Sequence, residues 1–110
     1  MEISYANSKI QKICTDDKTA RKKLGEKCAA VLDERLRQMG QAHNLEQLRF
    51  APGDWHELKG DRKGQLACNL LGLKRLVFAP ANVPRPMKSD GGLDWLQITA
   101  VVNLEIVDYH

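Results

Sequence analysis

The feature that most constrains this 110-residue chain is a change in hydrophobic period close to its middle. Before Pro52 and Gly53 the apolar residues recur mostly four apart, which places them on one face of a helix. After this break, apolar and polar residues alternate, as is typical of half-buried strands. This order predicts an α+β fold in which two N-terminal helices pack on a twisted, mainly antiparallel β-sheet. The length fits a single domain, residues 1–110.

The N-terminal half predicts a short edge strand at Glu2–Tyr5, a helical turn around Ser8–Ile13 and then one longer helix. An aspartate pair at positions 16 and 17 supplies N-cap candidates for that helix, and Gly40 is the expected residue after its C-terminus. Gly25 lies inside the helical pattern, where it costs about 1 kcal/mol relative to alanine. The face expected to be buried carries Leu24, Cys28, Leu32, Leu36 and Met39, and the opposite face carries Arg21, Lys22, Arg35 and Arg37.

Strands are predicted after the break, with hairpin turns at residues 60–64 and 71–73. Pro80–Gly92 contains three prolines and two adjacent glycines, so we expect an irregular excursion there. Arg75 alternates with Leu76 and Phe78 and points away from the core if those two point into it. We expect the sheet face away from the helices to be free for a ligand. The expected strands are Trp55–Lys59, Gln65–Leu71, Lys74–Ala79 and Leu96–Tyr109, the last as one long strand or two consecutive ones.

The composition is that of an ordinary globular protein with a modest excess of basic residues and a net charge of +3. Residues 1–40 carry nine basic and six acidic side chains, which makes nucleic acid a reasonable partner, although charge runs are most often solvated surface. No run of about 18 apolar residues predicts a membrane span, and the N-terminus carries no export signal, so we expect a cytoplasmic protein. Cys14, Cys28 and Cys68 lack zinc-site or disulfide spacing and are expected to be buried free thiols.

The densest set of chemically useful side chains lies between positions 56 and 64, at a strand end and its turn. Cleaving RNA through its 2′-hydroxyl needs a group that takes the hydroxyl proton, a group that protonates the leaving 5′-oxygen, and positive charge beside the phosphorus. His56 and His110 are candidates for proton transfer, and Lys59, Arg62 and Arg75 are candidates for phosphate contact. The chain offers no carboxylate cluster suited to Mg²⁺, so we expect no metal and no other cofactor.

Each candidate also has a purely structural interpretation. His56 lies beside Trp55 and fits a packed strand histidine, and the cations of the turn fit solvated loop charges. His110, as the last residue, fits a frayed chain end. Trp55 and Trp95 are far apart in sequence and fit core packing better than a base-stacking platform.

Three short segments carry motifs that can be compared with known proteins. His56–Gln65 contains the pattern H-x-L-K-G-D/N-R-x-G, Gly72–Leu76 contains G-x-x-R-L/I, and Glu105–His110 contains E-x-x-D-Y-H. In sequence, order and spacing these segments resemble the HigB-type plasmid-maintenance killer toxins of the RelE/ParE superfamily. Leu66 stands where those toxins usually have an aromatic residue, and Leu73 replaces a polar one.

This resemblance implies a RelE-like fold and the toxin of a type II toxin–antitoxin system, partnered by a HigA-like helix-turn-helix antitoxin. It also implies a metal-independent, ribosome-dependent endoribonuclease that cleaves mRNA in the A site and inhibits translation. The family's catalytic positions fall on His56, Lys59, Arg75, Asp108, Tyr109 and His110. We expect Arg62, Lys63 and Lys74 to bind RNA, with Arg62 at best a supporting phosphate contact.

Two other functions compete with RNA cleavage on the same fold. A ParE-like inhibitor of DNA gyrase has no need of His110, and a degenerate member binds only its antitoxin or DNA. Fold alone cannot choose among these functions, but both histidines, Lys59 and the Asp-Tyr-His ending favour the nuclease. In a regular strand Tyr109 points opposite to Asp108 and His110, so the three face one site only through a twist, a bulge or a terminal turn.

Overall fold

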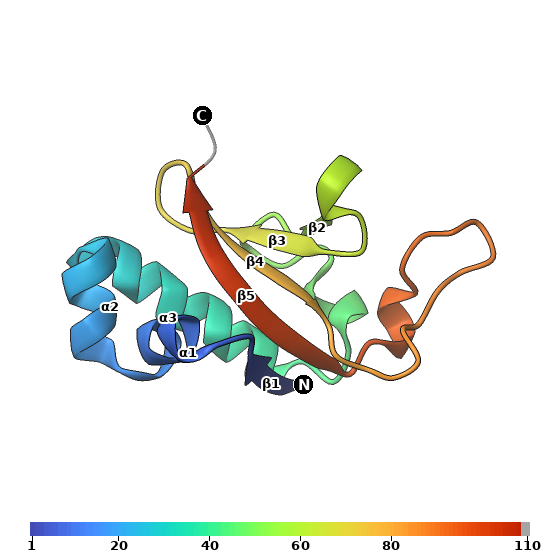
Figure 1. The fold of residues 1–110 in the computed structure, drawn as a ribbon, viewed down its shortest axis with the longest axis horizontal. Coiled ribbons are helices and arrows are strands. Elements are labelled where there is room, and N and C mark those ends of the chain that lie inside the picture. Colours follow the sequence, from blue (N-terminus) through green and yellow to red (C-terminus); the bar gives the residue numbers. More distant parts are fainter. Residues whose placement is uncertain (109–110) are drawn as a thin grey trace.

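The computed structural model describes residues 1–108, and its mixed helix and sheet architecture confirms the predicted α+β class (Figure 1). The helices lie against one face of a curved sheet, and the turn between β2 and β3 projects on the other side. The described helices are α1 (Ser8–Thr15), α2 (Asp17–Leu24) and α3 (Glu26–Gln41), and the strands are β1 (Glu2–Tyr5), β2 (His56–Glu57), β3 (Leu66–Asn69), β4 (Lys74–Pro80) and β5 (Ala100–Asp108).

The five strands form one sheet in the order β1-β5-β4-β3-β2. β1 runs parallel to β5, whereas the β5–β4, β4–β3 and β3–β2 pairs are antiparallel. The predicted short edge strand and the mainly antiparallel sheet are therefore confirmed. β5 is nine residues long and pairs with both β1 and β4, so its C-terminal end reaches the turn between β3 and β4 (Figure 1).

The N-terminal region contains three α-helices, where the sequence predicted two. Gly25 has φ +84° and ψ 159°, a conformation that ends α2 at Leu24 and starts α3 at Glu26. Glycine adopts this backbone without the steric cost that a Cβ would bring, so the residue breaks the helix that the hydrophobic pattern carries through it. Gly40 was expected to follow the helix, but it lies inside α3. The amino group of Met1 donates hydrogen bonds to the Met39 and Gly40 carbonyl oxygens and satisfies them in the last turn.

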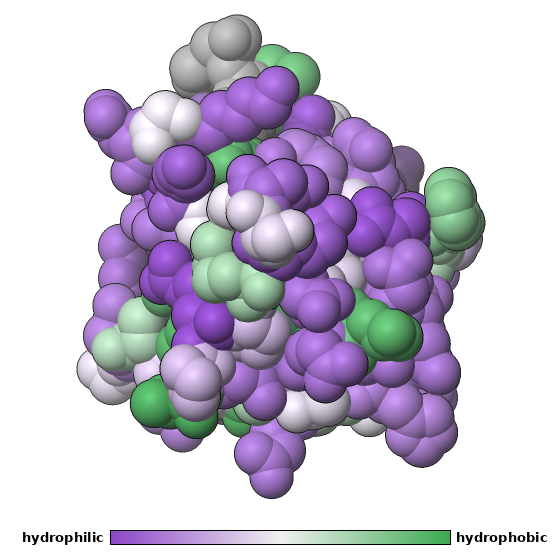
Figure 2. Space-filling model, turned by 90° about the vertical axis from the view of Figure 1, so that its right-hand side faces the viewer, coloured by the Kyte–Doolittle hydropathy of each residue, from purple (hydrophilic) through white to green (hydrophobic). Residues whose placement is uncertain are grey.

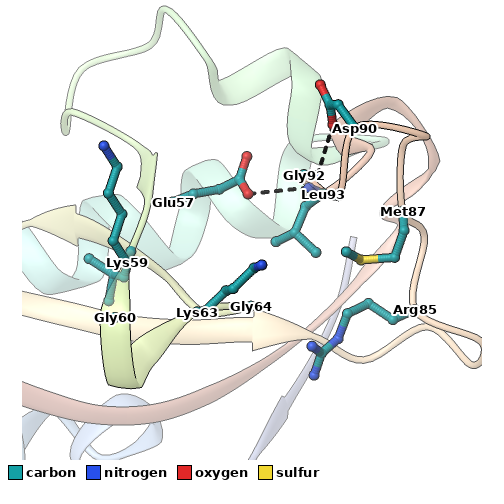
Figure 3. Close-up of a pocket in the computed structure, with 12 residues that line it drawn as sticks. Glu57, Lys59, Gly60, Lys63, Gly64, Arg85, Met87, Asp90, Gly92 and Leu93 are labelled. Atoms are coloured by element: carbon teal, nitrogen blue, oxygen red, sulfur yellow. Dashed lines mark hydrogen bonds between the residues drawn. The ribbon is translucent and has the colours of Figure 1, made fainter.

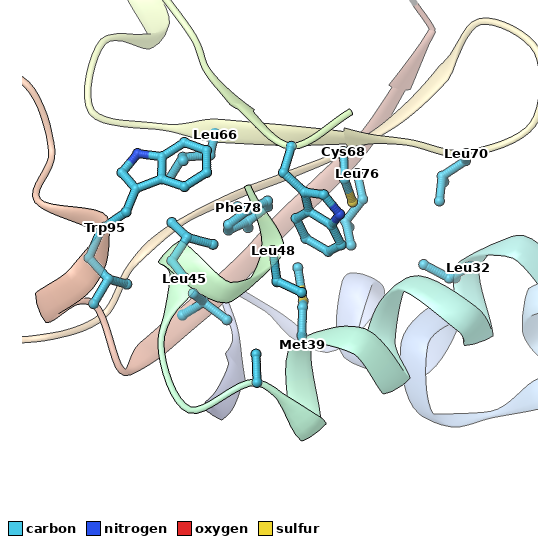
Figure 4. Close-up of a cluster of buried hydrophobic side chains, with 14 of the residues drawn as sticks. Leu32, Met39, Leu45, Leu48, Leu66, Cys68, Leu70, Leu76, Phe78 and Trp95 are labelled. Carbon is cyan, nitrogen blue, oxygen red and sulfur yellow. The ribbon is translucent and has the colours of Figure 1, made fainter. Parts of the chain in front are cut away.

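The hydrophobic core lies between the helices and the sheet (Figure 4). Leu66, Cys68 and Leu70 are all buried on one face, as the alternation predicted. Both tryptophans are core residues, and the Trp55 ring meets Phe78 edge to face with centroids 5.8 Å apart.

The cysteines are free thiols in different degrees of burial. Cys28 and Cys68 are buried, which confirms the expectation for these two, whereas Cys14 is half-buried. Burial raises the pKa of both Cys14 and Cys68 to about 12. At neutral pH these thiols are therefore protonated, and they behave as small apolar groups rather than nucleophiles.

Most of the predicted strand boundaries shift by one to four residues, and two short 3₁₀ turns lie near the ends of β2 and β5. β2 has only two residues, since Trp55 enters the core and a 3₁₀ turn forms at Gly60–Arg62. A second 3₁₀ turn at Trp95–Gln97 delays β5 to Ala100, and β5 is then one continuous strand. Residues 81–94, which we call the excursion, connect β4 to that turn without forming a strand of the sheet. No helix in residues 1–108 is long and apolar enough to cross a membrane.

Candidate functional site

The sheet face turned away from the helices, here called the outer face, carries two of the predicted site residues. His56 lies in one row with Ala67, Val77 and Glu105, because each pairs with the next across the strands. Arg75 lies in the neighbouring row, paired with Asn69 and Val107. Paired residues project to the same side of a sheet, and rows two residues apart share that side. His56 and Arg75 therefore share the outer face. Their backbones are separated by two strand spacings across the sheet and one two-residue repeat along it, which gives a distance of roughly 12 Å.

The His56 ring is held by the backbone just before it. Nδ1 lies 2.7 Å from the carbonyl oxygen of Asp54, and a carbonyl only accepts, so Nδ1 carries the proton of this hydrogen bond. In the neutral ring the other nitrogen, Nε2, is then the basic one. The side chain is 40% exposed, so His56 is not the packed strand histidine of the structural interpretation. It is an oriented histidine that a substrate can reach.

The end of the sheet beside the β3–β4 turn holds Arg75, Lys74 and Asp108. Arg75 Nη1 donates to the carbonyl oxygens of Gly72 at 3.1 Å and Lys74 at 3.0 Å, which orients the guanidinium along the turn. Lys74 Nζ lies 3.0 and 3.2 Å from the two carboxylate oxygens of Asp108. Lys74 and Asp108 are register partners with the parity of Leu76 and Ile106, so they belong to the helix side of the sheet rather than to the side of His56.

Arg62 occupies the centre of the outer face, which the sequence analysis expected to be free. From the β2–β3 turn its Nη2 reaches Glu105 Oε1 on β5 at 3.4 Å, and its Nη1 donates to Gln65 Oε1 at 2.9 Å. To reach Glu105 the Arg62 side chain crosses β3 and β4. Ala67 and Val77, which lie in the His56 row on those two strands, are fully buried. The charge of Arg62 is therefore already balanced within the protein, and the expectation of an entirely free face is wrong.

Lys59 and Lys63 lie at the opposite end of β2 from the Arg75 row. β2 runs from the neighbourhood of Asn69, whose amide donates to the Gly53 carbonyl oxygen, toward the β2–β3 turn. Both lysines line a pocket of about 600 Å³ between this turn and the excursion (Figure 3). The predicted cations therefore lie in three places. Arg75 and Lys74 are at the β3–β4 end, Arg62 crosses the centre of the outer face, and Lys59 and Lys63 are at the excursion end.

Glu57 is a positioning residue that the sequence analysis did not single out. Its carboxylate accepts the Leu93 amide at 3.2 Å and the Trp95 indole Nε1 at 3.1 Å, and so ties the excursion to β2 (Figure 3). The Arg49 guanidinium lies 4.1 Å from the centre of the Trp95 ring and packs against it. The available signal was parity: Glu57 pairs with Leu66, so a charged residue stands on the core-facing side of a strand.

Two of the predicted catalytic residues, Tyr109 and His110, lie outside the described residues. Of the others, the structure brings His56 and Arg75 to one face, with Lys59 at a distant edge and Asp108 in an ion pair on the other side. Within residues 1–108, no three His, Cys, Asp or Glu side chains gather in an arrangement that would hold a metal ion.

Comparisons with known proteins support the fold. No protein-family model matches the sequence, and no curated protein matches it. Among solved structures, a YoeB/ParE toxin from Agrobacterium tumefaciens matches with a TM-score of 0.59 over 100% of both chains, at 13% sequence identity. At that identity the likeness shows the fold alone: this chain has the fold of a protein described as a YoeB/ParE toxin.

Proposed function

We propose that this chain is the toxin of a type II toxin–antitoxin pair, of the HigB type, and that it cleaves mRNA in the ribosomal A site without a metal. The observation that carries the proposal is that His56, which is oriented and accessible, lies on the same face of the sheet as Arg75. The toxin fold of the structural neighbour and the three motifs support it independently. The expected partner is a HigA-like helix-turn-helix antitoxin, and the expected compartment is the cytoplasm.

The proposed reaction uses groups that these residues can supply. His56 Nε2 takes the proton of the 2′-hydroxyl, the 2′-oxygen bonds to phosphorus, and the bond from phosphorus to the 5′-oxygen breaks. The products are a 2′,3′-cyclic phosphate and a 5′-hydroxyl. Arg75 stabilises the negative charge that develops on the phosphoryl oxygens. By the family resemblance, His110 protonates the leaving oxygen.

The ribosome has a defined part in this proposal. His56 and Arg75 stand on strands whose backbones are roughly 12 Å apart, so they present a binding surface rather than a closed cavity. Such a surface leaves the alignment of the 2′-oxygen with the phosphorus to the ribosome, which holds the message. We therefore expect poor cleavage of naked RNA and efficient cleavage of message in the A site, with no dependence on added metal.

The first test is expression without a partner, followed by mapping of message ends by primer extension. We expect growth arrest, discrete cuts inside translated regions, and rescue by a helix-turn-helix protein encoded next to the gene. Intact messages with cleaved DNA would instead indicate a gyrase inhibitor. Harmless expression with normal translation would indicate a module that only binds its partner.

The second test assigns the chemistry with matched variants on purified ribosomes. His56→Ala should reduce A-site cleavage by about 10²- to 10⁴-fold, the usual effect of losing a positioned proton-transfer group. Arg75→Ala should reduce it by about 10²- to 10³-fold through lost charge stabilisation. His43→Ala and Arg37→Ala change exposed residues of the helical region and should cut at the parental rate. Full-rate cleavage by both outer-face variants would refute the assignment.

A further inference from the structure

The pocket between the β2–β3 turn and the excursion is lined by three cations and two carboxylates, so its lining carries a net charge of +1. Lys59, Lys63 and Arg85 line it, and within residues 1–108 none of the three forms an ion pair or a side-chain hydrogen bond. This contrasts with Arg62, which is paired with Glu105 a few residues along the same turn. Of the two carboxylates at the pocket, Glu57 is held by Leu93 and Trp95, and Asp90 accepts the Gly92 amide at 2.8 Å.

The pocket is built by both of its walls, and Arg85 is seated on the turn. At Gly64, with φ +91°, an added Cβ would stand 2.5 Å from Arg85 Nη1, so the guanidinium packs directly on the glycine backbone. The positive φ is the reason for glycine here, because an L side chain is strained in that backbone conformation. In the excursion, Met87 and Leu93 form a bridge, and the Leu93 amide is bound by Glu57. The excursion therefore has a defined position over the turn.

The chemistry of the lining combines cations with apolar side chains. Figure 3 shows Lys63 and Met87 pointing toward each other across the pocket, the Arg85 guanidinium lying below them, and Lys59 pointing away from these three side chains. Leu58 and Leu93 complete the apolar part of the lining. The volume of about 600 Å³ lies within the range of small-molecule sites and exceeds the needs of a phosphate ion. A ligand that satisfies this lining has an anionic group and an apolar body.

We propose that this pocket binds one nucleotide of the message, with its phosphate at Lys63 and Arg85 and its base against Met87. The proposal rests on the proposed function and deepens it, because the pocket adjoins the strand that carries His56. Arginine and lysine are suited to phosphate, and a methionine thioether makes favourable contacts with aromatic rings. An acidic peptide fits less well, since the cations share the pocket with an apolar lining that a carboxylate leaves unused. Figure 2, viewed from the excursion side, shows a mostly hydrophilic surface with scattered hydrophobic side chains, rather than one apolar docking patch.

A titration followed by amide NMR tests the site without relying on cleavage. The probes are uridine and adenosine 3′,5′-bisphosphates, with inorganic phosphate and an acidic peptide as comparisons. We expect shifts at the amides of Gly64, Met87 and Leu93, and weaker binding of phosphate alone. Arg85→Ala and Lys63→Ala should each weaken nucleotide binding by about tenfold or more, the effect of losing one charge-assisted hydrogen bond. Met87→Ala should weaken the nucleotides but leave phosphate unchanged.

Matched controls on the same excursion separate the pocket from general charge and exposure. Lys88→Ala removes a cation that does not line the pocket, and Val83→Ala shortens a side chain that is 95% exposed. Both should bind nucleotide as the parent does. An equal loss in Lys88→Ala and Arg85→Ala, the absence of amide shifts, equal affinity for phosphate and nucleotide, or preference for the peptide would each overturn the proposal.

Cleavage kinetics then distinguish failure of the pocket from failure of the proposed function. On ribosomes Arg85→Ala should raise KM more than it lowers kcat, because the reacting groups lie elsewhere. A parent protein that binds nucleotide in the pocket but cuts no message would support the site and refute the proposed function. A parent that cuts message while Arg85→Ala and Met87→Ala have unchanged KM would refute the site alone.

Discussion

His56 and Arg75 are positioned by strand pairing, whereas Lys63 and Arg85 are positioned by a turn and a loop. The first pair stands on β2 and β4, whose places are set by continuous backbone pairing through β3. The second pair depends on the contact of Arg85 with Gly64 and on the hold of Glu57 on the excursion. The sheet end, with His56 and Arg75, is therefore held by continuous backbone hydrogen bonds. The pocket end, with Lys63 and Arg85, is held by a few side-chain contacts.

In the proposed function the two ends have different roles. Proton transfer and charge stabilisation need groups fixed to within a fraction of an ångström, and regular strands provide that precision. Binding of a flexible single strand tolerates small movements and benefits from loops that adjust. The three predictions below test this contrast, beginning with the largest expected effect.

The proposed chemistry is tested most sharply by His110→Ala, a substitution outside the described part of the chain. If His110 protonates the leaving oxygen, the substitution should reduce A-site cleavage by about 10²- to 10⁴-fold. Stability should change by no more than about 0.5 kcal/mol, the scale of an ordinary surface substitution, and antitoxin binding should persist. Cleavage, thermal unfolding and antitoxin affinity are measured side by side, with tags kept off the C-terminus. Cutting at the full rate would show that His110 is not the proton donor.

The pocket end is tested by Glu57→Ala, which releases the excursion. The substitution leaves the indole of Trp95, 3% exposed, without its acceptor, so unfolding free energy should fall by about 1–3 kcal/mol. Hydrogen exchange at the Leu93 amide should accelerate, while protection in β4 and β5 is retained. Glu57→Gln keeps an acceptor oxygen and should recover part of the loss.

Glu34→Ala serves as the control for this prediction, because Glu34 is an exposed glutamate of α3 with only a 4.0 Å approach to Arg35. It should change stability by less than about 0.5 kcal/mol. Unchanged exchange at Leu93 in Glu57→Ala would mean that other contacts hold the excursion, and the contrast between the two ends would weaken.

The smallest effect concerns the ion pair that joins the two ends, Arg62 with Glu105. The side chains are 34% and 53% exposed, so a double-mutant cycle of Arg62→Ala and Glu105→Ala should give a coupling of about 0.2–1 kcal/mol that shrinks in salt. We expect cleavage to fall far less than in Arg75→Ala, since Arg62 is already paired. A larger loss in Arg62→Ala would make this arginine a direct phosphate contact.

Much of the fold follows from local sequence signals. The alternation through Leu66, Cys68 and Leu70 predicts a buried strand face. The same rule places Arg75 on the other face of its strand from the buried Phe78. Gly25 shows where local signals are insufficient. Its cost inside a helix is about 1 kcal/mol, which the hydrophobic stripe on either side can offset, so the sequence pattern alone does not reveal the break at φ +84°.

The candidate site divides in the same way between local and non-local information. Motif spacing alone selected His56, Lys59 and Arg75 as chemically important residues. It could not reveal that Lys59 lies across the sheet from Arg75, or that the excursion brings Arg85 onto Gly64. Those positions depend on contacts between segments far apart in the chain, and such contacts leave no periodic trace in either segment.

By itself, then, the sequence determined the α+β class and the strand faces, and it predicted which residues would carry RNA chemistry, because periodicity and residue type are local properties. Only the tertiary structure decided that Arg62 closes the centre of the outer face through Glu105 and that Lys63 and Arg85 share a pocket. The physical reason is that a side chain's charge is balanced or left available by its neighbours in space. Those neighbours are chosen by strand order and loop packing rather than by position along the chain.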